Sequence, residues 1–285
     1  TMVGEIGDES GMTMVAEYSS VGPDGQARLH MGYCFDLLAD RHDAPYIHSV
    51  IDKFERVAPS AERGWACWAL SNHDCKRLAS RWGGDTPDPA LLRLAPALQL
   101  SLRGAVCLYQ GEELGLPEAD IAFEDLQDPY GITMWPEFKG RDGCRTPFPW
   151  ETAAPDLGFG HGSAKPWLPL AESHRALAVD AQEADPAALL HHYRHLLRWR
   201  RTRPELMQGS LQLLPVDAQV LAYVREHAGA RLLCAFNLSA QPARLALPDG
   251  LRVAELLSDS GARGAALDGA ALQFDPYGVL FARLA

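Results

Sequence analysis

The stretch WACWALSNHD, residues 65–74, is the part of the sequence on which the interpretation of the fold rests. A short apolar run, residues 65–70, is followed directly by Ser71, Asn72, His73 and Asp74. This pattern is typical of a buried strand that ends in a polar loop. Parallel sheets of α/β domains place their active-site residues in such loops.

The same pattern recurs on both sides of this stretch. Apolar runs at 2–5, 30–35 and 105–109 each end where polar or glycine-containing sequence begins, and helical patterns occupy 46–57 and 89–102. Strands that alternate with helices indicate βα units and a parallel sheet. We expect this organisation from Thr1 to about Arg203.

The pattern changes after one last strong helix. This helix begins at Asp185-Pro186, an N-cap followed by a proline in the first turn, and ends near Pro204. Beyond it, apolar residues alternate with polar ones, which predicts strands at 211–214, 220–225, 231–237, 243–247, 252–256 and 278–282. We therefore predict an α/β domain over residues 1–205 and a small antiparallel β domain over 206–285.

The segment 115–170 differs from both regions. It is rich in proline and glycine, shows little periodicity and still contains several large aromatic residues: Trp135, Phe138, Phe148, Trp150 and Trp167. Loops this long inside compact domains are functional or disordered, and the aromatic residues favour order. We expect an ordered wall or lid of a site.

Composition excludes several classes of function. A net charge of -11, with 37 acidic and 26 basic residues, argues against a nucleic-acid partner. No apolar run approaches the ~18 residues of a membrane span, so we expect a soluble protein without a membrane partner. Six scattered cysteines without CxxC pairs, and no visible signal peptide, favour a reducing compartment and hence the cytoplasm.

Four segments carry the residue types of an active site, and each follows a predicted strand. They are 4–8 with Glu5 and Asp8, 71–77 with Arg77, 109–113 with two adjacent glutamates, and 140–145 with Arg141 and Arg145. The ends of successive parallel strands meet at one edge, so we expect these segments to converge.

Each segment also has a purely structural interpretation. Glu5 could be a solvated acid at a strand end, and Asp74 could cap the next helix. Glu112 and Glu113 could form a polar first helical turn, favoured by the helix dipole. Arg141 and Arg145 could have a purely structural role and hold the loop together. The order in which the four segments occur favours function.

Together the segments resemble those of the alpha-amylase family, glycoside hydrolase family 13, and most closely its bacterial alpha-glucosidases. Val3-Gly4-Glu5 is similar to the motif after barrel strand five, and Asn72-His73-Asp74 is similar to the motif after strand seven. The run 109–115 resembles the strand-eight signature of the alpha-glucosidases, and 140–150 resembles their substrate loop. The resemblance extends from the first residues into the C-terminal β domain. It implies the second half of a (β/α)8 barrel, strands five to eight, followed by a β-sandwich.

The resemblance also implies roles for four residues. Glu5 would be the general acid/base, which requires a pKa raised by a dry setting, and Asp74 would stabilise the transition state. His73 and Arg141 would bind the sugar, whereas Arg145 would be structural. The implied activity is that of a retaining alpha-glucosidase acting on small alpha-glucosides such as maltose.

The family's nucleophilic aspartate, after strand four, has no counterpart here. The sequence resembles the family from strand five onward, so we expect a segment with strands one to four to complete the barrel, either from the same gene product or from a separate chain. No metal site or cofactor is expected: His191, His192 and His195 lie on one helix without a completing ligand set, and a solvated face explains them better. The family's calcium site would lie upstream.

Two alternatives remain open. The first is a non-catalytic protein of the same fold, such as the ectodomain of a transporter heavy chain, although Glu5, His73 and Asp74 are all present. The second is a glucosyl transferase or sucrose-cleaving enzyme, which differs only in what intercepts the covalent intermediate. Linkage preference is not predicted, because residues beside the nucleophile help to set it.

Overall fold

A computed structural model describes residues 1–160 and 165–285. Clustering of contacts divides the chain into two compact units. The first comprises residues 1–69, 93–107 and 195–285, and the second comprises 70–92 and 108–194. This division does not coincide with the expected boundary at 205/206, which stays a prediction.

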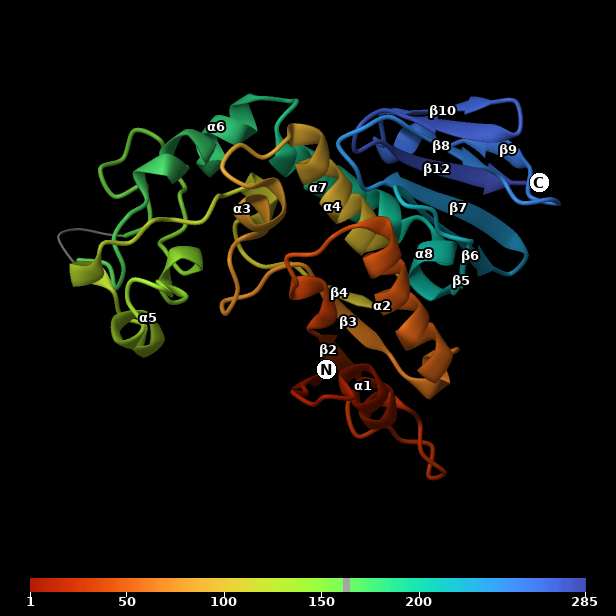
Figure 1. The fold of residues 1–285 in the computed structure, drawn as a ribbon, viewed down its shortest axis with the longest axis horizontal. Coiled ribbons are helices and arrows are strands. Elements are labelled where there is room, and N and C mark those ends of the chain that lie inside the picture. The colour runs from red at the N-terminus through yellow and green to blue at the C-terminus, as the bar shows by residue number, and fades with distance from the viewer. Residues whose placement is uncertain (161–164) are drawn as a thin grey trace. The chain divides into compact units, whose positions relative to one another are not determined.

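The first unit contains a parallel sheet of four strands in the order of the sequence (Figure 1). Tyr33 lies opposite both Glu5 and Cys67, and Cys67 lies opposite Ala105. The four apolar runs are therefore confirmed as neighbouring strands: β1 (Val3–Glu5), β2 (Met31–Cys34), β3 (Ala66–Ala69) and β4 (Ala105–Cys107).

Three longer helices accompany these strands: α1 (Gly11–Ser19), α2 (Ala44–Val57) and α4 (Pro89–Ser101), of which residues from 93 belong to this unit. The side chain of Asp43 accepts a hydrogen bond from the backbone N–H of Tyr46, and a proline occupies the first turn of α2. That cap explains why α2 begins two residues before its predicted start. Phe54 of α2 packs edge-on against Trp68 of β3, with ring centroids 5.6 Å apart.

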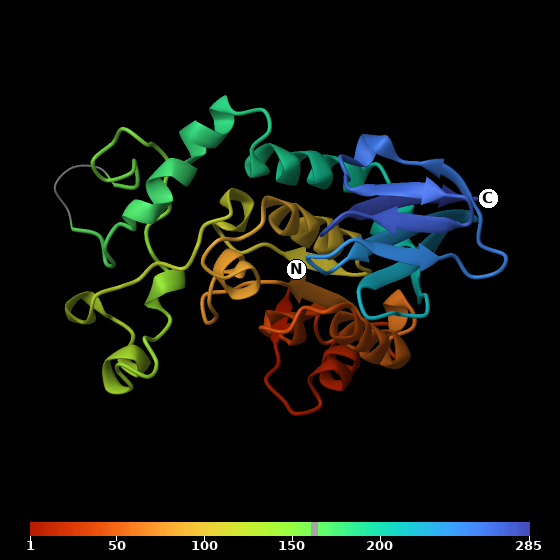
Figure 2. The same cartoon turned by 45° about the horizontal axis from the view of Figure 1, so that its top comes forward.

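The C-terminal strands form two antiparallel sheets (Figures 1 and 2, teal to blue). The larger sheet has the order β5-β6-β7-β12-β9 and the smaller has the order β10-β11-β8. Side chains from both sheets, including Val220, Leu233 and Phe274, share one buried core, as expected for a β-sandwich. The strands are β5 (Ser210–Leu213), β6 (Val220–His227), β7 (Ala230–Asn237), β8 (Ala243–Ala246), β9 (Val253–Leu256), β10 (Ala265–Asp268), β11 (Ala271–Phe274) and β12 (Val279–Leu284).

A buried arginine joins this sheet to helix ends. Arg225 of β6 has no exposed surface, and its guanidinium donates to the carbonyl oxygens of Ser101 at 2.5 Å and Gly209 at 2.9 Å. The hydroxyl of Tyr223 lies 2.7 Å from that of Ser101. Burial lowers the pKa of Arg225 to about 10. Carbonyls at helix ends have no partner within the helix, and the sheet supplies one here.

The second unit is built from short helices and irregular chain, as expected for segment 115–170. Residues 161–164 of that segment lie outside the described part of the chain. Small apolar clusters support it, one around Leu114, Leu116 and Leu190 and another around Ile121, Leu126 and Trp135. The helices are α3 (Leu78–Gly83), α5 (Pro129–Thr133), α6 (Val179–Ala184), the start of α7 (Leu189–Arg201) and several 3-10 turns; α8 (Pro204–Gln208) belongs to the first unit.

Candidate active site

Asp74 lies in the loop between β3 and α3. Its backbone N–H donates to Oδ1 of Asn72 at 2.9 Å, so the asparagine shapes the turn that presents it. Helix α3 begins at Leu78, whose N–H is accepted by the hydroxyl of Ser71 at 3.2 Å. The carboxylate of Asp74 therefore does not cap α3, and the capping interpretation is wrong.

The carboxylate of Asp74 instead meets three basic side chains. Its Oδ1 lies 3.0 Å from Nη1 of Arg141, 2.8 Å from Nη2 of Arg145 and 3.5 Å from Nε2 of His73. Among the described residues, Oδ1 makes all the recorded contacts of this carboxylate, and the side chain is 40% exposed. Oδ2 is thus available to a hydroxyl group of a ligand.

Arg141 is held from behind by Asp128. Nε and Nη2 of Arg141 lie 2.8 and 2.9 Å from the two oxygens of Asp128, and the backbone N–H of Arg141 donates to Oδ2 at 2.8 Å. This is the two-point geometry that a guanidinium forms with a carboxylate. Hydrogen bonds from Arg141 keep the pKa of Asp128 well below its ordinary value, and the same pair raises the pKa of Arg141.

Asp128 is a site residue that sequence reasoning missed. Its only local signal is the Asp-Pro step before α5, where its side chain accepts a hydrogen bond from the N–H of Tyr130. That signal predicts a helix cap and not a partner thirteen residues away. The side chain of Asp128 has no exposed surface.

Arg145 contributes as much to this arrangement as Arg141. Besides Asp74, its Nε donates to the carbonyl oxygen of His73 at 2.6 Å. The expected distinction between a sugar-binding Arg141 and a structural Arg145 is not visible in these contacts, because both guanidinium groups bind the same oxygen of Asp74.

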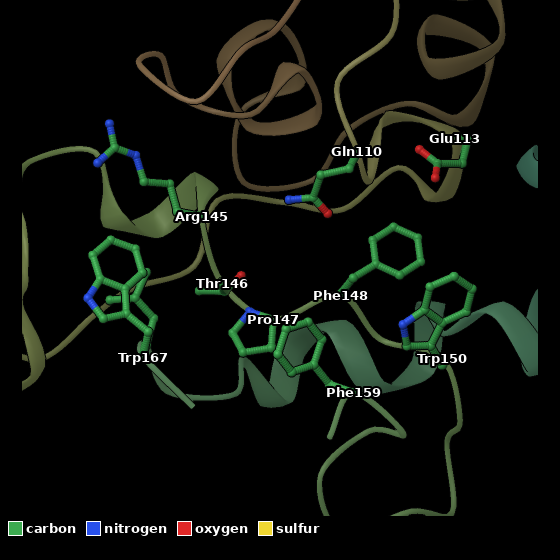
Figure 3. A pocket seen from close by; sticks show the side chains of 10 residues that line it. Gln110, Glu113, Arg145, Thr146, Pro147, Phe148, Trp150, Phe159 and Trp167 are labelled. Carbon is green, nitrogen blue, oxygen red and sulfur yellow. The ribbon is translucent and has the colours of Figure 1, made fainter. Parts of the chain in front are cut away.

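A cavity of about 500 Å³ adjoins Arg145 within the same unit. Figure 3 shows aromatic side chains around it, among them Phe148, Trp150, Phe159 and Trp167. Gln110 and Glu113 supply polar groups on another side. An apolar cavity with a few polar groups is the usual form of a small-molecule site. Of the five aromatic residues expected to form a wall, Phe148, Trp150 and Trp167 line this cavity, whereas Trp135 and Phe138 do not.

Segments 71–77 and 109–113 are also joined directly. Arg77 is buried, and its Nη1 donates to the carbonyl oxygen of Gln110 at 2.8 Å. Gly111 adopts a φ of 93°, and a Cβ there would lie 2.5 Å from Nη1 of Arg77, so glycine is needed for this approach.

Glu5 belongs to the first unit. It is the last residue of β1, and its side chain is exposed. The dry setting that an acid/base requires is therefore not formed by the described residues of this chain. Asp8 builds the turn that follows, accepting a hydrogen bond from the N–H of Ser10 at 2.7 Å.

Glu112 does not sit in a solvated first turn. It begins a 3-10 turn, Glu112–Leu114, and is buried. Burial raises the pKa of its carboxyl to about 8, and the nearby Ser71 opposes the shift only in part. Glu112 thus stays protonated in the folded protein under conditions that ionise it in the unfolded chain.

This shift predicts a pH-dependent stability. Between the ordinary pKa of 4.5 and about 8, only the unfolded state loses the proton, so the free energy of unfolding should fall as pH rises and level off above 8. Glu112→Gln should remove this contribution, with a difference in slope of up to about 1.4 kcal/mol per pH unit. Urea unfolding from pH 5 to 9 measures it, with Glu137→Gln at an exposed position as control. Parallel pH profiles for parent and Glu112→Gln would contradict the assignment.

The histidines of α7 have partners on the protein. His195 contacts the carbonyl oxygen of Asp259 at 2.7 Å, and His191 contacts that of Glu183 at 3.3 Å, whereas His192 is buried. Within residues 1–160 and 165–285, no cluster of three or more histidine, cysteine or acidic side chains could hold a metal.

All six cysteines are free thiols, four of them buried. The described helices include none with the length and apolarity to cross a bilayer.

Two family descriptions match the chain. "Alpha amylase, catalytic domain" matches residues 8–209, and "Maltogenic Amylase, C-terminal domain" matches residues 211–280. Together they cover most of the sequence.

Named relatives agree with these matches. A probable alpha-glucosidase of Rhizobium meliloti (strain 1021) is 46% identical over 99% of this chain and 50% of its own length. A probable oligo-1,6-glucosidase 3 of Bacillus subtilis (strain 168) is 32% identical over 63% of this chain and 35% of its own length. The chain thus spans about half the length of the first of these relatives and a smaller share of the second.

Solved structures of similar proteins also cover nearly the whole of this chain and about half of their own length. An alpha-glucosyl transfer enzyme, XgtA, is similar with a TM-score of 0.89 and 49% identity, over 99% of this chain and 50% of its own. The trehalulose synthase MutB from Pseudomonas mesoacidophila MX-45 is similar with a TM-score of 0.79 and 26% identity, over 96% of this chain and 54% of its own.

Proposed function

Because the chain belongs to the alpha-amylase family of glycoside hydrolases, we propose that it supplies the acid/base and the transition-state stabiliser of a retaining alpha-glucosidase. The observation that carries the proposal is the Asp74 carboxylate, held at Oδ1 by Arg141 and Arg145 with Oδ2 left for a ligand. An acid fixed in this way is oriented before the substrate arrives, as electrostatic catalysis requires.

Retention requires two carboxylates roughly 5 Å apart, one that attacks the anomeric carbon and one that protonates the leaving oxygen. Glu5 takes the second role and afterwards removes a proton from water. A nucleophilic carboxylate comes from a segment outside this chain, which also supplies the missing barrel strands and the dry surroundings of Glu5. Asp74 binds ring hydroxyls more tightly as the sugar becomes oxocarbenium-like, with His73 and Arg141 beside it.

Transfer of glucose to an acceptor other than water is the second candidate. The activities of two similar proteins favour it, since one is an alpha-glucosyl transfer enzyme and the other a trehalulose synthase. Both reactions share the glycosyl-enzyme intermediate and differ in the nucleophile that resolves it.

The aromatic wall sets an expectation about substrate size. In the full-length protein, maltose and aryl alpha-glucosides should turn over far better than soluble starch, because residues of 115–170 close one end of the site. Values of kcat/KM on the three substrates measure this, with a starch-degrading amylase as the positive control for the polymer. Comparable rates on starch would overturn the pocket-shaped site.

A further inference from the structure

We propose that Asp128 is a positioning residue that fixes the guanidinium of Arg141 against Asp74, an inference that rests on the proposed function. Asp128 carries a charge yet has no exposed surface. Burying a charge raises the free energy of the folded state unless the charge is paired and hydrogen-bonded. The groups that pair with Asp128 therefore indicate its role.

Within the described part of the chain, three of the four hydrogen bonds to this carboxylate come from Arg141. Both oxygens accept from the guanidinium, at 2.8 and 2.9 Å, and Oδ2 also accepts from the backbone N–H of Arg141. Two points on the guanidinium and one on the backbone fix the side chain at both ends. Nη1 then points to Asp74 at 3.0 Å.

Asp128 is itself held in place from the other side. The Oδ2 atom of Asp142 accepts hydrogen bonds from the N–H groups of Gln127 at 2.6 Å and Asp128 at 2.8 Å. Asp142 has no exposed surface. The chain of contacts therefore runs from Asp142 to Asp128, then to Arg141 and Asp74.

The loop is packed so tightly that this geometry has little freedom. Gly140 has a φ of 80°, and a Cβ there would lie 2.8 Å from Cα of Gly131 and 3.0 Å from Oδ2 of Asp128. A Cβ on Gly131 would lie 2.6 Å from the carbonyl oxygen of Lys139. Two stretches of the loop thus meet backbone to backbone beside the carboxylate.

The competing explanation is that Asp128 only caps α5. It does accept a hydrogen bond from Tyr130 N–H, at 3.2 Å, but α5 has only five residues. Asparagine caps helices about as well as aspartate but cannot form the charged two-point pair. Asp128→Asn therefore separates the two roles.

In the full-length protein, Asp128→Asn should lower kcat/KM for p-nitrophenyl alpha-glucoside roughly 10- to 100-fold, with KM rising and the melting temperature little changed. Arg141→Lys should lose a similar amount, because a single ammonium cannot pair with Asp128 and reach Asp74 together. The double variant should be no more than about threefold worse than Arg141→Lys alone, because the two residues act as one unit. Asp120→Asn, which removes an exposed ion pair with Lys139, serves as control and should match the parent.

Additive losses in the double variant, or Asp128→Asn within about threefold of the parent, would overturn the proposal. If Asp128→Asn does not fold, Arg141→Lys with near-parental activity overturns it instead. A crystal structure of Asp128→Asn should show Arg141 displaced from Asp74, and an unmoved Arg141 counts against the proposal. Failure of the proposed function is distinct, because the parent itself would then not hydrolyse the aryl glucoside.

Discussion

Asp74→Asn in the full-length protein is expected to lower kcat on maltose roughly 10²- to 10³-fold, the usual effect of removing one preorganised group that stabilises a transition state. Thermal unfolding should change little, since the substituted side chain still offers an amide Oδ1 to Arg141 and Arg145. The helix that follows is unaffected, because the N–H of Leu78 is accepted by Ser71.

Asp88→Asn is the matched control, because Asp88 does cap a helix: its Oδ1 accepts from the N–H of Ala90 at 2.8 Å. That substitution should leave turnover unchanged and alter stability by no more than ~1 kcal/mol. Activity of Asp74→Asn within about a factor of ten of the parent would show that Asp74 is misassigned.

Glu5→Gln should produce an effect that depends on the leaving group. Maltose, whose sugar alcohol leaves poorly without a proton, should lose most of its rate, whereas the first step with alpha-glucosyl fluoride should be nearly spared. Water attack would still lack its base, so the glycosyl-enzyme should accumulate. Azide, which needs no deprotonation, should restore turnover and give a product of alpha configuration.

Steady-state rates on both substrates, mass spectrometry of the trapped intermediate and analysis of the azide product test this expectation. Glu9→Gln, at an exposed position in the loop after β1, is the control. Equal losses on maltose and the fluoride, with no effect of azide, would leave Glu5 as an ordinary acid at a strand end.

The sequence was sufficient to predict the parallel strands, which are short apolar runs ending in polar loops, and the antiparallel strands of the C-terminal domain, where apolar and polar residues alternate. It did not reveal the hairpin of β10 and β11, where alanine and glycine give little strand preference, although Asp268-Gly269 is a turn signal. It also did not reveal α1, which begins without a side-chain cap.

Part of the site was predicted because its residues directly follow a strand that the sequence indicates. Asn72, His73 and Asp74 form a short motif that follows a recognisable strand, and Asp74 does meet Arg141. The role of Asp128 and the burial of Glu112 could not be predicted, because contacts with Arg141 and burial are not encoded in any local pattern. The conformation of an irregular loop depends on contacts between residues far apart in the sequence, and hydrophobic periodicity does not predict such contacts.

The buried guanidinium of Arg225 makes the C-terminal sheet part of the structure that ends two helices. It satisfies the carbonyl of Ser101, the last residue of α4, and that of Gly209, directly after α8. A protein shortened before β6 would lose this donor and leave two helix ends to find other partners. We therefore expect that deleting the sheet destabilises these helix ends, and shortened variants of this protein should retain it.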